Sequence, residues 1–139
     1  MESLIKTKQE VQESFNKIIL NMCNHMANKY PNTYFGIYHD TAVKFITERP
    51  TEPIAYFIKY VYSNDEYREK ILAQDESYFM GQEYKEVSQD HSVKIFEIKE
   101  LWSTLDDTTK KLIKMTFKHL ADRTKLYVDI LSDINKLKK

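Results

Sequence analysis

The C-terminal stretch of this chain decides its fold. It runs from Asp106 to Lys139 as DDTTKKLIKMTFKHLADRTKLYVDILSDINKLKK and contains neither Gly nor Pro. Its apolar residues recur at spacings of three, four or seven, which line one face of an α-helix. These residues are Ile113, Phe117, Leu120, Tyr127, Leu131 and Ile134. The stretch therefore predicts one long C-terminal helix.

This predicted helix is long compared with the chain that carries it. About thirty helical residues span about 45 Å, which is more than a compact domain of this size is expected to measure across. We therefore expect part of the apolar face to meet a surface outside its own core. Because symmetric dimers are the commonest closed assemblies, the same six apolar residues are the predicted self-association surface of a homodimer.

The rest of the chain also predicts helices. Only two Gly and three Pro interrupt 139 residues, and no stretch alternates apolar and polar residues as a strand does. The spacing of Leu4, Val11, Phe15 and Met22 predicts a long N-terminal helix that ends before Pro31. Shorter helices are predicted at 40–49, 51–61, 63–74 and 92–105, with a loop at 31–39 and a helical turn and loop at 75–90. The fold prediction is an all-α single domain, residues 1–139, a compact bundle of five to seven helices with long N- and C-terminal helices.

Capping residues mark where the predicted helices begin. Ser, Thr and Asp side chains accept hydrogen bonds from the free amides of a first helical turn. Ser63 is followed three residues later by Glu66, which is the arrangement of a capping box. The predicted N-caps are Asp40, Thr51, Ser63, Ser92 and Asp106.

Composition limits the class of protein. Hydrophobic residues make up 42% of the chain and charged residues 30%, which is typical of a folded globular domain. A lone cysteine, Cys23, excludes an internal disulfide and favours a reducing compartment. Nothing approaches the roughly 20 apolar residues of a membrane span. We expect an intracellular protein without a membrane partner.

The charge is neutral in total but unevenly distributed. Residues 1–90 carry ten Lys and Arg against fourteen Asp and Glu, and residues 91–139 carry eleven against seven, which gives −4 and +4. Lysines of the C-terminal third could contact nucleic-acid phosphates, although Asp122 and Asp129 share their sector, as on a solvated face with ion pairs. The candidate lysines are Lys111, Lys114, Lys118, Lys125, Lys136, Lys138 and Lys139.

Residues suited to catalysis are scattered. The histidines at 25, 39, 91 and 119 form no metal-binding motif, and no glycine-rich phosphate loop is present. Cys23 lies beside Met22 and near Met26, so it is interpreted as a core side chain rather than a nucleophile. Pairs of acids occur at 65–66, 75–76 and 106–107. Each pair falls where a helix is predicted to start, which favours capping over acid–base chemistry. The sequence therefore predicts no catalytic residue, no metal and no cofactor.

Two runs resemble a viral family. Ile71-Leu-Ala-Gln-Asp-Glu-Ser-Tyr-Phe79 and the run from Ile98 to Ile113, IKELWSTLDDTTKKLI, are similar to small uncharacterised proteins of nucleocytoplasmic large DNA viruses of the marseillevirus type. The resemblance covers about residues 55–131, but such relatives carry Trp at or beside Lys114 and Tyr close to Met115. It implies an early or virion-packaged protein that acts at the viral factory or host nucleus, with DNA-binding ability, and it brings no catalytic residue.

The resulting functional prediction is a non-enzymatic helical interaction protein that self-associates. The alternative is a DNA-binding protein that uses the basic C-terminal third.

Overall fold

The computed structural model describes residues 1–81 and 102–138, and within these residues every regular element is helical. The elements are α1 (Glu2–Lys29), α2 (Tyr34–Ile37), α3 (His39–Glu48), α4 (Glu52–Phe57), the π-helical segment η1 (Ile58–Tyr62), α5 (Asp65–Leu72), α6 (Ser77–Gly81) and α8 (Asp107–Leu137). The prediction of an all-α bundle with long N- and C-terminal helices is confirmed. The predicted cap Ser92 and most of the helix predicted at 92–105 lie outside the described residues.

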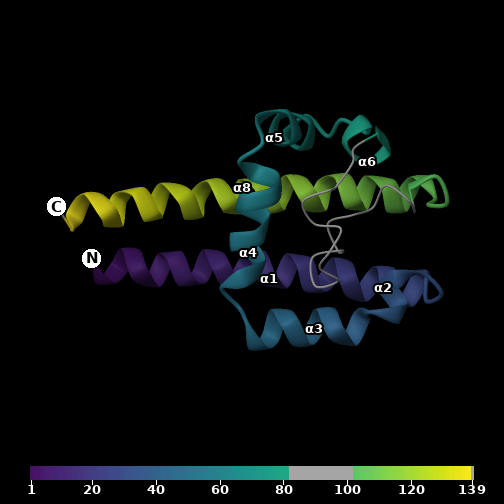
Figure 1. Ribbon diagram of the computed structural model, residues 1–139, viewed down its shortest axis with the longest axis horizontal. Helices are drawn as coiled ribbons and strands as arrows, with labels where there is room; N and C mark the ends of the chain where they lie inside the picture. The colour runs from purple at the N-terminus through teal and green to yellow at the C-terminus, as the bar shows by residue number, and fades with distance from the viewer. Residues whose placement is uncertain (82–101, 139) are drawn as a thin grey trace.

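The two long helices, α1 and α8, lie side by side and antiparallel, so both chain ends are at the same end of the molecule (Figure 1). Their lengths of 28 and 31 residues correspond to about 42 and 46 Å. Arg123 Nε of α8 donates a hydrogen bond to Ser14 Oγ of α1 at 3.0 Å. The remaining helices pack around this pair, with α3 against α1, α5 against α8, and α4 crossing α1 and continuing as η1 over α8 (Figure 1).

The core is built largely from aromatic rings. Phe117 of α8 lies 5.1 Å from Phe79 and 6.4 Å from Phe57 between ring centroids, and all three side chains are buried. Phe79 also stacks on Trp102 at 4.8 Å, with an interplanar angle of 10°. Phe57 in turn meets Phe15 of α1 edge to face at 5.5 Å. The ring contacts therefore connect α1, α4, α6 and α8 through one continuous cluster.

The ends of α1 and α8 project beyond this core. We define residues 1–10 and 126–138 as the terminal extension, which Figure 1 shows as a pair of helices reaching past the other elements on the side of the chain ends. Ile134 of this extension is buried, with 6% of its surface exposed, but does not belong to the contiguous core cluster. The extension therefore has a buried apolar side chain of its own, apart from the core.

The sequence predicted the positions of the helices better than the residues that cap them. Asp106 caps α8 as predicted, because its Oδ1 accepts from the Thr109 amide at 2.8 Å. The predicted capping box at Ser63 is wrong: Asn64 caps α5, and Ser63 Oγ instead donates to the Lys59 carbonyl at 2.9 Å.

Two other local predictions also differ from the structure. Within the predicted loop at 31–39, residues 34–37 form the single helical turn α2. A Cβ at Gly36 would lie 2.0 Å from the Pro31 carbonyl oxygen, so this turn requires glycine. The helix α3 starts one residue before Asp40, which lies in its first turn and does not cap it.

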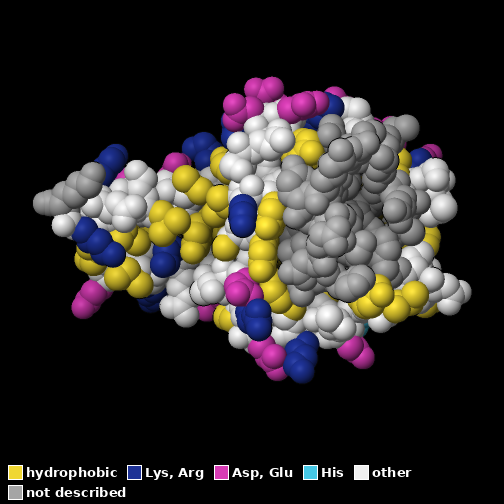
Figure 2. Space-filling view, viewed as in Figure 1, with side chains coloured by type: hydrophobic (Ala, Val, Ile, Leu, Met, Phe, Trp, Pro, Cys, Tyr) yellow, Lys and Arg dark blue, Asp and Glu magenta, His cyan; other side chains and the backbone are white. Residues whose placement is uncertain are grey.

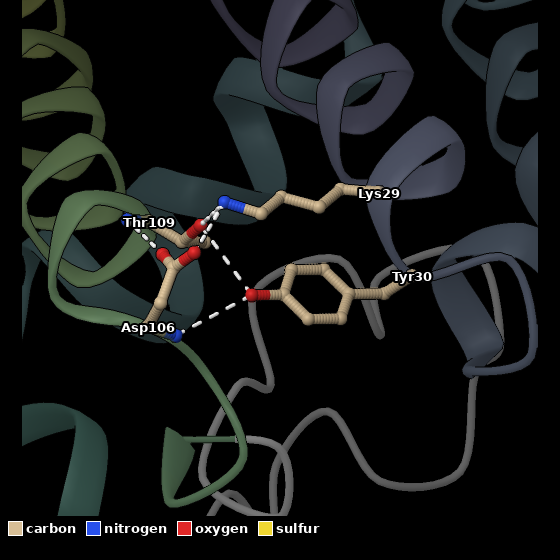
Figure 3. Close-up of polar contacts among 4 residues, drawn as sticks. All are labelled: Lys29, Tyr30, Asp106 and Thr109. Atoms are coloured by element: carbon tan, nitrogen blue, oxygen red, sulfur yellow. Dashed lines mark hydrogen bonds and ion pairs between the residues drawn. The ribbon is translucent and has the colours of Figure 1, made fainter.

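A polar cluster fixes the end of α1 to the start of α8 (Figure 3). Lys29 Nζ donates to Asp106 Oδ2 at 2.5 Å and to Thr109 Oγ1 at 2.9 Å. The Tyr30 hydroxyl lies 3.4 Å from both Thr109 Oγ1 and the Asp106 amide. The Lys29 ammonium, with the Thr109 donors, holds the pKa of Asp106 well below its usual range, and the same hydrogen bond raises the pKa of Lys29. Both shifts favour the ionised pair.

We predict that this cluster stabilises the fold only where both groups are ionised. A lowered carboxyl pKa contributes stability above its unfolded value of about 4, which is lost as the pH falls through the folded value. The contribution of Lys29 is fully present below about pH 10 and is lost as the pH rises further. Asp106→Asn keeps the cap but removes the charge. Its deficit in urea midpoint relative to wild type should be large at pH 7 and shrink as the pH is lowered from 4 toward 2; a constant deficit would contradict this.

We also predict that Phe117 is among the most costly core positions to truncate. Its ring is fully buried and touches three other aromatic rings. Phe117→Ala should lower the free energy of unfolding by about 3–5 kcal/mol, measured by urea denaturation. Leu72→Ala, at a side chain that is 41% exposed, is the matched control and should cost less than about 1 kcal/mol. Equal losses for the two variants would mean that the aromatic cluster is not the centre of the core.

Candidate interaction surface

The six apolar residues of the predicted self-association surface lie in three different environments. Ile113, Phe117 and Leu120 are fully buried in the core of the single chain. Ile134 is 6% exposed and lies in the terminal extension. Tyr127 and Leu131 are half-buried. Most of this face is therefore covered inside the subunit, and only Tyr127 and Leu131 retain surface that a partner could reach.

A second apolar stripe on α8 remains exposed. We define the outer stripe as Leu112, Met115, His119, Leu126, Ile130 and Leu137. Wound at about 100° per residue, these positions fall within about 60° of one another and about 120° away from the buried face. Met115, Leu126 and Leu137 are 50%, 49% and 59% exposed, His119 is exposed, and Leu112 and Ile130 are half-buried. The outer stripe runs almost the whole length of α8.

The outer stripe has a signal in the sequence. Leu112, Met115, Leu126 and Ile130 are separated by three, eleven and four residues, which are helical spacings. This pattern is weaker than that of the buried face, because His119, Asp122 and Asp133 interrupt it. Figure 2 shows apolar side chains on the visible face of the terminal extension. Within this extension, Leu4, Tyr127, Val128 and Leu131 are half-buried.

The candidate nucleic-acid lysines are partly neutralised by acids on the same helix. Lys118 Nζ lies 3.2 Å from Asp122 Oδ2, and Lys125 Nζ lies 3.0 Å from Asp129 Oδ2. Ion pairs that involve Lys111, Lys114, Lys136 or Lys138 are absent among the described residues, and Lys139 lies outside them. The described part of the basic C-terminal third is thus a face of mixed sign, and DNA binding stays a prediction.

The residue types that could bind a metal or act in catalysis have structural roles in the described residues. Within residues 1–81 and 102–138, no group of three or more His, Cys, Asp or Glu could hold a metal ion. Burial raises the pKa of the Cys23 thiol to about 12, so the thiol stays protonated. Asp65 pairs with Arg68 at 2.7 Å and Glu66 with Lys70 at 3.1 Å in the first turns of α5, as expected of acids at a helix start.

None of the described helices is long and apolar enough to cross a membrane. Comparison of the chain with family models, with curated proteins and with solved structures found no match. The resemblance to small proteins of large DNA viruses therefore remains a prediction.

We predict that the contact within the terminal extension depends on Ile134 rather than on the nearby Leu137. Ile134→Ala removes a buried side chain and should cost about 1–2 kcal/mol locally, near the lower end for such truncations because the site lies outside the core. Leu137→Ala changes an exposed side chain and should have little effect. Amide hydrogen exchange should therefore speed up at 128–137 and at 1–8 in the first variant only. Unchanged exchange in Ile134→Ala would show that the two ends are not held by this contact.

Proposed function

We propose that this protein is a helical interaction protein that self-associates through the outer stripe of α8. The observation that supports the proposal is the exposure of Met115 and Leu126, each about half exposed, on a regular helix outside the core. Single exposed apolar side chains are common on soluble proteins, whereas a row of them along one helix is typical of a helix-packing surface.

A second copy of the chain is the occupant that the surrounding charges favour. On one flank of the stripe, Lys118 and Lys125 pair with Asp122 and Asp129 at 3.2 and 3.0 Å. These acids offset part of the positive charge of a lysine-rich flank, so two copies can face each other with less repulsion, and opposite charges beside an apolar seam set the orientation of paired helices. A flank of a single sign would have favoured a partner of opposite charge.

The size of the stripe predicts a weak complex. Covering the exposed half of one such side chain contributes about 1 kcal/mol. Met115 and Leu126 from two copies, with the partly exposed Leu112 and Ile130, therefore supply a small apolar area for an interface, which predicts a low affinity. We expect a dimer that forms at high protein concentration and dissociates on dilution.

Sedimentation velocity over a range of concentrations tests the proposal. The 16.6 kDa chain should shift toward a dimer as its concentration rises toward about 1 mM. Leu126→Lys places a charge in the stripe and should abolish the shift. Leu72→Lys is the matched control, because Leu72 is similarly exposed at 41% but lies on α5, and it should sediment like wild type.

Two results would overturn the proposal. One is a chain that stays monomeric up to about 1 mM. The other is a dimer that Leu126→Lys leaves intact. If the dimer survives Leu126→Lys but is lost in Leu131→Lys, association uses the apolar face of the terminal extension instead, and the outer stripe has no part in it.

A further inference from the structure

One edge of the outer stripe borders α1. Arg123 Nε of α8 donates a hydrogen bond to Ser14 Oγ of α1 at 3.0 Å, so the side of α8 that carries Arg123 faces α1. Wound at about 100° per residue, Leu112 and Ile130 project within about 20° of Arg123. Both side chains are half-buried, as expected beside a neighbouring helix. Leu112 and Ile130 are therefore the edge of the stripe nearest to α1.

On the other side of this boundary, α1 carries an apolar side chain. Ile18 follows Ser14 by four residues and projects within about 40° of it. Ile18 is half-buried, so part of its surface stays accessible. The segment between α3 and α4 meets the opposite side of α1, where Asn16 Nδ2 donates to the Pro50 carbonyl at 2.8 Å. Ile18 and the outer stripe thus share one side of the α1–α8 pair.

The level of Ile18 along the pair matches the polar interruption of the stripe. Because α1 and α8 are antiparallel, the four residues from Ser14 forward to Ile18 correspond to the four residues from Arg123 back to His119. His119 is the exposed polar residue between the two apolar halves of the stripe. Ile18 therefore supplies, from α1, an apolar side chain at the level where α8 lacks one.

We propose that a second copy of the chain packs over the boundary between the two helices, so that Ile18 of α1 is part of the self-association surface. This inference rests on the proposed function, because it takes the outer stripe as the contact with the second copy. A partner that covers only Met115 and Leu126 leaves Leu112 and Ile130 partly exposed. A partner shifted toward α1 covers these two side chains and reaches Ile18, which adds apolar area to a small interface.

The same boundary contains a charged group that limits the affinity. Ser14 accepts from one donor of the Arg123 guanidinium, and no further hydrogen bond or ion pair of this group is present within residues 1–81 and 102–138. Covering a guanidinium whose donors lack acceptors costs desolvation free energy. A surface that joins Ile18 to the stripe therefore remains compatible with a weak complex.

Methyl NMR of the wild-type chain, isotope-labelled at its isoleucine methyl groups, tests the proposal without a substitution. As the concentration rises from about 50 μM to about 1 mM, the signals of Ile18 and Ile130 should shift together. Ile5 is the matched control on α1, because it is 46% exposed and projects about 140° away from Ile18. Its signal should not move. A shift of Ile130 without a shift of Ile18 would overturn the proposal and leave association through α8 alone.

Sedimentation of two α1 variants gives an independent measure. Ile18→Lys places a charge at the boundary and should raise the dissociation constant of the dimer at least about tenfold. Leu20→Lys is the matched control, because Leu20 is also half-buried and packs on the core but projects about 160° away from Ile18. It should dimerise like wild type.

Equal dissociation constants for Ile18→Lys and Leu20→Lys would overturn the shared surface while leaving self-association through α8 intact. Absence of any wild-type dimer in sedimentation, with no methyl signal that depends on concentration, would instead remove the proposed function. The two failures are therefore distinguishable.

Discussion

The antiparallel packing of α1 against α8 is the constraint on which the rest of the structure depends. These are the two longest helices, and their contact is the most extensive between any two described elements. Phe15 from α1 and Phe117 from α8 both reach Phe57 of the crossing helix α4. The crossing helix can therefore pack only where the two long helices already lie side by side. Without this pair, α3 and α5 would each lose the helix against which they pack.

The length and the limits of the long helices could be predicted because the signals for them are local. Asp106 begins α8, and the absence of Gly and Pro lets the helix continue to Leu137. The caps of the shorter helices were less predictable, because two neighbouring residues can each serve as the N-cap. Ser63 and Asn64 are both good N-caps, and the choice depends on where the preceding segment ends. The π-helical turn at Ile58–Tyr62 extends that segment, so Ser63 Oγ bonds back to Lys59 and Asn64 is left to cap α5.

The candidate surface was harder to predict, because a helical pattern does not tell which of two apolar faces is covered. The sequence showed that Ile113 and Phe117 share a face and that the helix is long. It did not show that α1, of nearly equal length, lies along that helix and covers this face. The exposed apolar side chains of α8 are therefore those of the outer stripe around Met115 and Leu126. The distinction depends on tertiary packing between residues more than a hundred positions apart in sequence, as the contact of Ser14 with Arg123 illustrates.

The polar interruptions of the outer stripe have opposite effects in the free chain and in a helix pair. In the free chain, His119 is exposed and Asp122 is paired with Lys118, so these polar groups of the stripe stay in contact with water. In a helix pair, the same groups carry a desolvation penalty unless each meets a partner. A stripe made only of Leu and Met would pack in several registers with similar energies, as uniform apolar seams do. The polar interruptions therefore lower the affinity of a helix pair and at the same time limit the geometries in which it can form.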